Sequence, residues 1–159
     1  LQGLVTQRLE SESGDFIIRR RDGLIAYHLA VVVDDHLHSV TDIVRGIDLM
    51  DSTPRQLWLQ RLLDIPQPGY AHIPVAVNAL GQKLSKSHGA GAVPLASPAP
   101  TLIAALEALA LQPPPGLASA SVGEIWSWAR QHWRIDRLQG RREIPVGHLR
   151  AEILQRPVS

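Results

Sequence analysis

With 159 residues, 45% of them hydrophobic, the chain has the size of one ordinary domain and enough apolar residues for a core. The absence of cysteine excludes disulfide bonds and thiolate metal sites within the chain, and no apolar run reaches transmembrane length. Its first residues lack a basic region followed by a long apolar segment. We therefore expect a soluble cytoplasmic protein without a signal peptide or a membrane partner.

Charge is distributed unevenly along the sequence, although the net charge is only +1. Residues 1–129 carry nine basic and twelve acidic side chains, whereas residues 130–159 carry seven Arg and three acidic residues. Such a basic segment is typical of a surface that contacts phosphates, and an ordinary solvated face is the alternative. Its basic residues are Arg130, Arg134, Arg137, Arg141, Arg142, Arg150 and Arg156.

The first part of the chain contains short segments of differing character. Residues 1–14 are polar and do not begin with Met, so we expect them to continue a segment that starts earlier in a longer protein. Residues 15–20, DFIIRR, have the composition of a short strand, and Asp22-Gly23 then predicts a turn. Residues 29–33, LAVVV, favour a buried strand by propensity alone.

The next part predicts a strand, a helix and a second strand. Residues 40–44 predict the first strand, and residues 72–77 the second, followed by a turn at residues 78–81. Between them, Thr53 and Gln56 form a potential capping box with Pro54 at the first helical position. This order is typical of a parallel α/β sheet with its site at the carboxyl ends of the strands. The expected apolar stripe of the helix, with Trp58 in the core, is Leu57, Trp58, Leu62 and Ile65.

A short loop after the second strand contains every lysine of the chain. The sequence has fourteen Arg but only Lys83 and Lys86, both within residues 83–87, KLSKS. A compact, mobile cation on a Ser-containing loop suits a phosphate whose charge changes during a reaction, and a solvated polar turn is the alternative. The candidate phosphate-binding residues are Lys83, Leu84, Ser85, Lys86 and Ser87.

The last part of the chain predicts two helices. Residues 89–100 have the composition of a small-residue linker, and residues 101–111 predict an Ala/Leu-rich helix that ends before Pro113. Ser121 and Glu124 predict a capping box at the start of the second helix. Its expected core stripe is Val122, Trp126, Ala129 and Trp133, with base stacking as the alternative role for the aromatic residues and with Trp128 outside the stripe.

Three motifs in this order resemble the class I aminoacyl-tRNA synthetases. Residues 83–87 are similar to the KMSKS signature of that class, with Leu84 in place of Met. Residues 22–36, DGLIAYHLAVVVDDH, and residues 40–49, VTDIVRGIDL, resemble its glutamyl branch. Within that branch the likeness is greatest to the short glutamyl-queuosine tRNA(Asp) synthetases. It extends over residues 15–159 and is strongest before residue 88.

The resemblance implies an α/β fold, namely the second half of a Rossmann-like catalytic domain followed by a small, mainly helical region. The implied boundaries are residues 1–25 for the end of an inserted acceptor-binding-like segment, 26–90 for the catalytic half and 91–159 for a stem-contact-like region. Residues 29–33 would then be helical, because tertiary context overrides propensity. Asp34 and Asp35 would lie about 100° apart on that helix, which favours structural hydrogen bonding over a shared ligand.

The resemblance also assigns residues to substrates. Arg45 matches the Arg that reads the side-chain carboxylate of glutamate, and an ion pair with Asp42 or Asp48 is the alternative. Tyr27 matches a Tyr that contacts bound glutamate, and a core Tyr is the alternative. The loop of residues 83–87 would bind ATP, with Lys86 as the catalytic residue that stabilises phosphate charge during glutamate activation.

The implied partners are glutamate, ATP with Mg²⁺, and tRNA, with tRNA(Asp) favoured, and we expect a monomer. The HIGH-type signature and the Cys-rich zinc site of the family have no counterpart in these residues. Zinc would therefore belong to a preceding half, and catalysis would need that half. The histidines of this chain lack zinc-ligand spacing, since the nearest pair, His36 and His38, is too small a set.

The sequence leaves two further functions open. One is a fragment of a glutamyl-tRNA synthetase that charges tRNA(Glu), whose catalytic domain would continue into a helical anticodon-binding domain. Only 72 residues follow Ser87, and this length favours the short queuosine branch. The other is a non-catalytic nucleic-acid-binding module, because half of the expected site is missing.

Overall fold

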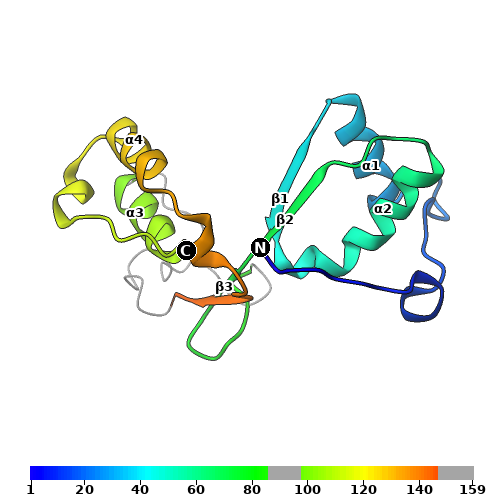
Figure 1. The fold of residues 1–159 in the computed structure, drawn as a ribbon, viewed down its shortest axis with the longest axis horizontal. Helices are drawn as coiled ribbons and strands as arrows, with labels where there is room; N and C mark the ends of the chain where they lie inside the picture. Colours follow the sequence, from blue (N-terminus) through cyan, green and yellow to red (C-terminus); the bar gives the residue numbers. More distant parts are fainter. Residues whose placement is uncertain (86–97, 147–159) are drawn as a thin grey trace. The chain divides into compact units, whose positions relative to one another are not determined.

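The computed structural model describes residues 1–85 and 98–146. The chain divides into two compact units, an N-terminal unit of Gln2–Ile73 and a C-terminal unit of Leu1 with the residues from Pro74 onward. Parallel strands and helices in both units agree with the predicted α/β class (Figure 1). The segment boundaries expected from the resemblance stay predictions.

The N-terminal unit is built on two parallel strands. β1 (Asp42–Gly46) pairs with β2 (Gly69–Ile73) in a register that places Arg45 opposite His72. The connection contains the 3₁₀ turn Ile47–Ser52 and α2 (Thr53–Leu62), as a parallel pair requires a crossover. α1 (Tyr27–Leu37) packs against α2. The predicted strand–helix–strand order is confirmed, with the first strand shifted two residues toward the C-terminus.

In the segment before β1, local propensity and tertiary context predict different structures. Residues 29–33 lie inside α1, as the resemblance implied and against their strand propensity. The strand predicted over residues 15–20 is reduced to one bridge between Arg19 and Ile25. The predicted turn between them is confirmed, because Gly23 has φ 87° and its N–H donates to the Arg20 carbonyl at 3.0 Å.

The strand predicted over residues 72–77 is wrong as a single element. It is divided at Pro74 into β2 and β3 (Val75–Val77), and β3 pairs in parallel with β4 (Glu143–Pro145) instead of β1. Proline has no N–H for a strand ladder, so the chain changes pairing partner at this residue. The division also coincides with the boundary between the two units.

The loop of residues 83–87 begins on the second arm of a tight turn that follows β3. The Asn78 side chain accepts hydrogen bonds from the Leu80 and Gln82 N–H groups at 2.9 and 3.0 Å, which confirms the predicted turn. Lys83 then pairs with Val77, and the Leu84 N–H donates to the Ala76 carbonyl at 2.9 Å. Lys86 and Ser87 lie outside the described residues, as do residues 89–97 of the expected linker.

The C-terminal unit has a small helical core. α3 (Pro98–Ala108) packs against α4 (Val122–His132), and the 3₁₀ turns Pro115–Ser119 and Ile135–Leu138 follow these helices. The core consists of Leu106, Leu111, Ile125 and Ala129. α3 starts three residues before the predicted Thr101, so Pro98–Pro100 belong to the helix and not to the linker. The Ser121–Glu124 capping box is confirmed, with both reciprocal hydrogen bonds present.

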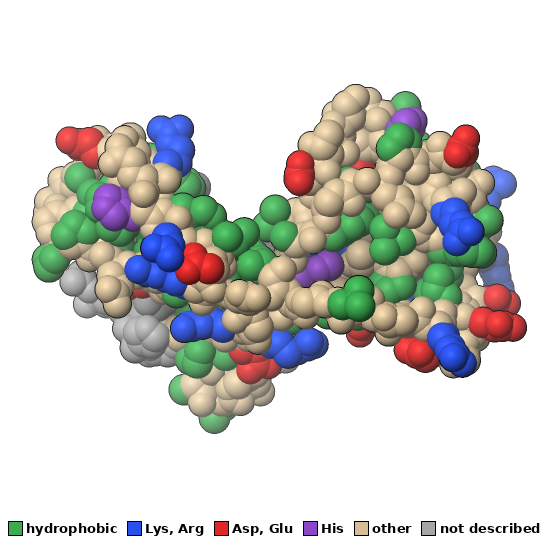
Figure 2. All heavy atoms as spheres, viewed as in Figure 1, with side chains coloured by type: hydrophobic (Ala, Val, Ile, Leu, Met, Phe, Trp, Pro, Cys, Tyr) green, Lys and Arg blue, Asp and Glu red, His purple; other side chains and the backbone are tan. Residues whose placement is uncertain are grey.

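Both predicted apolar stripes are largely wrong. On α2, Trp58 is 43% and Leu62 63% exposed, while Leu59 and two glutamines are buried. On α4, Trp126 is 50% and Trp133 40% exposed; Ile125 and Ala129 face the core, and Trp128 packs against it. Of the predicted α4 stripe, only Ala129 is buried. Figure 2 accordingly shows hydrophobic side chains at the surface of both units.

No helix within the described ranges is long and apolar enough to cross a membrane. The same ranges contain no group of three or more His, Asp or Glu side chains placed to hold a metal ion.

Candidate functional site

Arg45, on β1, is the centre of a polar cluster in the N-terminal unit. Its Nη2 donates to Thr53 Oγ1 and its Nη1 to Gln56 Oε1, both at 2.7 Å. Its Nε lies 3.4 Å from His72 Nε2 on the neighbouring strand, at the long limit of a hydrogen bond. The guanidinium plane is therefore fixed by three side chains from two elements.

These contacts replace the predicted helix cap. Thr53 and Gln56 were expected to form a capping box at the start of α2, but Thr53 is the first helical residue and Ser52 precedes it without a side-chain cap. Both predicted capping side chains are buried, at 9% and 1% exposure, and are directed to Arg45. A cation offers a stronger hydrogen bond than a backbone N–H, so this arrangement prevails over the local capping signal.

His72 completes the cluster in its neutral form. Arginine can only donate, so Arg45 Nε forms a hydrogen bond with His72 Nε2 in the tautomer in which that nitrogen carries no proton and accepts. Thr53 can then donate its hydroxyl to the same nitrogen at 2.9 Å. Burial lowers the pKa of His72, and the Arg45 charge lowers it further. In that tautomer the proton of the neutral ring resides on Nδ1.

Tyr70 covers the guanidinium with its aromatic face. The Arg45 Cζ atom lies 5.2 Å from the centre of the Tyr70 ring, which also stacks parallel to His72 at 6.4 Å. Gln60, 1% exposed, donates to the Tyr70 hydroxyl at 3.0 Å. Burial raises the pKa of Tyr70, whereas the hydrogen bond from Gln60 and the Arg45 charge oppose this rise. The electron-rich face of the ring stabilises the guanidinium charge and helps to hold its plane in place.

Tyr27, the other predicted glutamate contact, lies at the start of α1 and is 50% exposed. It is therefore not a core Tyr. Burial is the main cause of the raised pKa of Tyr70, and Tyr27 makes the smallest contribution to it. The neighbouring His28 ring lies 5.3 Å from Tyr27, and burial together with Arg55 and Arg45 lowers the pKa of His28. Of the two predicted glutamate contacts, Arg45 is thus held in the polar cluster, and the role of Tyr27 stays a prediction.

The remaining hydrogen-bonding capacity of Arg45 defines what the cluster can bind. A guanidinium has five N–H donors, and three of them are directed to Gln56, Thr53 and His72. Counting partners among residues 1–85 and 98–146, one donor remains on each terminal nitrogen. Two such N–H groups on one rigid plane match the two oxygens of a carboxylate. The Asp42 carboxylate, one of the two alternative ion-pair partners expected for Arg45, accepts from the Thr41 hydroxyl at 2.9 Å.

The sequence analysis predicted Arg45 and Tyr27 as glutamate contacts, which stay predictions, but missed the side chains that hold the arginine. His72 and Tyr70 were treated only as strand residues, and Thr53 and Gln56 as helix caps. The signal that could have found them is the register of the two parallel strands, which places Arg45 opposite His72 and is seen only in the structure. Lys83 and Ser85 of the predicted ATP-binding loop belong to the other unit, so their role and that of Lys86 stay predictions.

Comparison with known proteins identifies the family. Residues 1–96 match the tRNA synthetases class I (E and Q) catalytic domain, and the chain belongs to that family. Two solved structures of the glutamate tRNA ligases from Elizabethkingia meningosepticum and Elizabethkingia anophelis share its fold. Each has a TM-score of 0.57 at 18% identity, covering 83% of this chain and 30% of the other. The predicted α/β class I synthetase fold is thereby confirmed.

Curated relatives are more similar in sequence. The Glutamyl-Q tRNA(Asp) synthetase of Ectopseudomonas mendocina is 49% identical over 150 residues, and that of Methylococcus capsulatus is 50% identical over 149. The protein of the same name from Pseudomonas aeruginosa is 50% identical over 149 residues. Each alignment covers 94% of this chain, which spans about half the length of these relatives.

Proposed function

We propose that the protein containing this chain activates glutamate with ATP and transfers it to the queuosine base of tRNA(Asp). The observation that carries the proposal is the Arg45 guanidinium, fixed by three side chains and left with one N–H donor on each terminal nitrogen. The names of relatives at about 50% identity support the choice of acceptor.

Arg45 reads the distal carboxylate of glutamate in this proposal. A carboxylate accepts two parallel N–H···O bonds from one guanidinium and neutralises its charge. The amide of glutamine offers one acceptor oxygen and no charge, so the same fixed cation discriminates against it. Tyr27, which is exposed at the start of α1, contributes a hydroxyl to the same amino acid.

Activation joins the glutamate α-carboxylate to ATP. A carboxylate oxygen attacks the α-phosphorus, the bond to the leaving pyrophosphate breaks, and glutamyl-adenylate forms. The glutamyl group then passes to a nucleophile on the tRNA, and AMP leaves. Lys86 stabilises the phosphate charge that develops in the first step, and residues 83–87 hold the ATP phosphates.

Mg²⁺ enters this proposal through ATP. The described residues provide no cluster of carboxylates or imidazoles for a dedicated metal site. Mg²⁺ typically retains several waters and binds substrate phosphates with one or two carboxylates, so it does not need such a cluster. When bound, it neutralises phosphate charge, while Arg45 and Tyr27 position the amino acid.

The first test is glutamate-dependent ATP–pyrophosphate exchange by the whole protein. We expect exchange with glutamate, and at least tenfold less with glutamine or aspartate at equal concentration. Efficient exchange with glutamine would contradict the role of Arg45. Absence of exchange with any amino acid, with or without tRNA, would favour a non-catalytic nucleic-acid-binding module.

The second test identifies the acceptor. Purified tRNA(Asp) with and without queuosine, and tRNA(Glu), are incubated with labelled glutamate, ATP and the whole protein. We expect label only on the queuosine-containing tRNA(Asp). Preferential labelling of tRNA(Glu) would overturn the acceptor and leave glutamate activation standing.

A further inference from the structure

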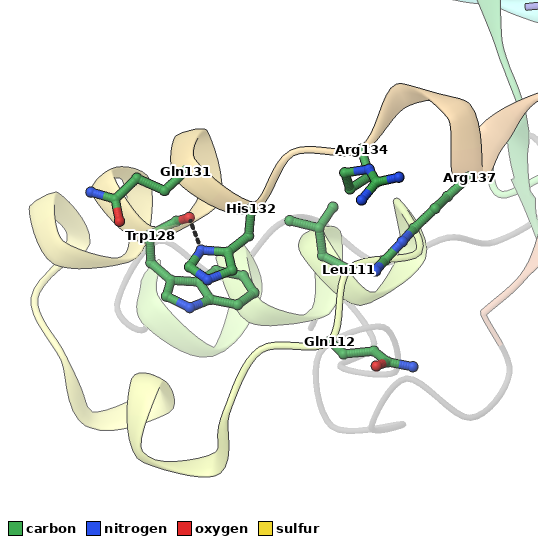
Figure 3. A pocket seen from close by; sticks show the side chains of 7 residues that line it. All are labelled: Leu111, Gln112, Trp128, Gln131, His132, Arg134 and Arg137. Carbon is green, nitrogen blue, oxygen red and sulfur yellow. Dashed lines mark hydrogen bonds between the residues drawn. The ribbon is translucent and has the colours of Figure 1, made fainter.

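A second candidate site lies in the C-terminal unit, between α4 and the turn that follows it. It is a pocket of about 340 Å³, within the range that small ligand groups occupy in proteins. Figure 3 shows an aromatic pair on one side, two arginines on the other and Leu111 between them. The lining residues are Leu111, Gln112, Trp128, Gln131, His132, Arg134 and Arg137.

The aromatic side of the pocket is held in place before any ligand binds. Trp128 and His132 are four residues apart on α4, and their rings stack at 4.4 Å with an angle of 12° between planes. The His132 Nδ1–H donates to the Trp128 carbonyl at 2.8 Å, which fixes the orientation of the imidazole (Figure 3). Trp128 is anchored against the helical core, whereas His132 is exposed. The stack therefore presents an imidazole face to solvent without further ordering cost.

The cationic side is also ordered. Arg137 Nη1 donates to the Ala110 carbonyl at 3.0 Å, so one terminal nitrogen is fixed while the guanidinium keeps further donors. Arg134 forms two hydrogen bonds to Asp136, at 3.1 and 3.0 Å. Two arginines and one aspartate leave this side with a net positive charge. Arg137, without an ion pair among the described residues, is the stronger candidate for an anion.

We propose that this pocket binds one nucleotide of an RNA strand, with the base stacked on His132 and a phosphate oxygen accepting from Arg137. An exposed ring face accepts any base, and arginine is well suited to phosphate oxygens. The inference rests on the proposed tRNA acceptor and adds a contact surface distinct from the Arg45 cluster. Because neither group reads base edges, the pocket positions the RNA and does not select its sequence.

The test is binding of labelled tRNA(Asp) to the whole protein by fluorescence anisotropy at several salt concentrations. Arg137→Gln should weaken binding of every RNA similarly and reduce the salt slope by about one unit. His132→Ala should weaken binding about fivefold or more, the lower end for loss of one stacked base. His132→Phe keeps an aromatic face and should bind within about twofold of the unsubstituted protein.

The matched control is Arg130→Gln. Arg130 is exposed on α4, the helix that carries His132, and does not line the pocket, so its substitution removes the same charge as Arg137→Gln at a position outside the pocket. Circular dichroism confirms that each variant is folded. Unchanged affinity and salt slope in both Arg137→Gln and His132→Ala, or an equal loss in Arg130→Gln, would overturn the proposal.

A competition experiment separates an RNA strand from a free nucleotide. AMP at about 1 mM should not displace tRNA, since one nucleotide lacks the neighbouring phosphate contacts of a strand. Displacement that His132→Ala abolishes would assign the pocket to a free nucleotide and overturn the RNA proposal. Failure of glutamate-dependent exchange would refute the proposed function, whereas loss of these variant effects would refute only the pocket.

Discussion

Arg45→Lys tests the glutamate site most directly, because it keeps the charge and removes the planar fork. In the structure, two terminal nitrogens reach Thr53 and Gln56 at 2.7 Å each. Lysine has a single ammonium nitrogen and no planar fork, so it cannot make both contacts and also bind a ligand. At least one buried side-chain oxygen then loses its partner, which costs about 1–3 kcal/mol.

The effect on glutamate follows from the same geometry. Replacing a bidentate carboxylate contact by a single point-charge contact removes one charged hydrogen bond, about 1.5–3 kcal/mol. Since 1.4 kcal/mol corresponds to about tenfold, the KM for glutamate should rise at least tenfold. ATP does not contact Arg45 in the proposed site, so the KM for ATP should change by less than about threefold.

The assay is ATP–pyrophosphate exchange, with glutamate varied at saturating ATP and ATP varied at saturating glutamate. Arg61→Lys is the matched control, because Arg61 is exposed on the same helix as Thr53 and Gln56, with its guanidinium 5.9 Å from the Trp58 ring centre. It should leave both constants unchanged. Equal increases in both constants for Arg45→Lys would show a structural role, and an unchanged glutamate constant would refute the carboxylate assignment.

Four further predictions follow from other residues. Gln56→Leu removes an Arg45 partner and should raise the KM for glutamate about threefold to tenfold, with a smaller change in kcat, measured by the same exchange assay. Lys86→Ala should lower the exchange rate by about 100-fold or more without lowering the melting temperature, and an unchanged rate would refute its catalytic role. The pKa of His72 lies below 6.5 in the folded state, so its contribution to the free energy of unfolding is complete above pH 6.5 and declines as the pH falls. Thermal melts should show a melting temperature that decreases at low pH, and His72→Gln should weaken this pH dependence. Ser121→Ala removes the α4 capping box and should lower the melting temperature by roughly 4 °C, with Ser119→Ala as a nearby control.

The elements that the sequence predicted well depend on local interactions. The Asp22-Gly23 turn needs only a residue that tolerates positive φ, and Gly23 has φ 87°. The Ser121–Glu124 box is closed by side chains three residues apart, so the sequence contains all of its information. α1 is different, because its β-branched run favours a strand and only the resemblance to a family predicted the helix.

The elements that were predicted wrongly depend on partners distant in the chain. The strand over residues 72–77 looked continuous, yet Pro74 divides it between pairing with β1 and pairing with β4. The stripe on α4 was placed on Val122, Trp126, Ala129 and Trp133, but of these only Ala129 belongs to the core, together with the unpredicted Ile125. A helical wheel with apolar residues on several sides does not indicate which side meets the neighbour. That choice is made by packing.

The Arg45 cluster shows why the supporting residues of a site are harder to predict than its central residue. The local sequence at Thr53 and Gln56 satisfies the capping pattern, and no short-range rule distinguishes a cap from a ligand to a cation. The parallel register supplies the missing fact, because it places Arg45 opposite His72 beside the start of α2. Burying the polar side chains of Gln56 and Gln60 costs free energy unless each forms a hydrogen bond. Gln56 accepts a hydrogen bond from Arg45, and Gln60 donates to the hydroxyl of Tyr70, whose ring covers the guanidinium. This face of α2, which was predicted to be apolar in part, therefore orients the proposed glutamate-binding cation.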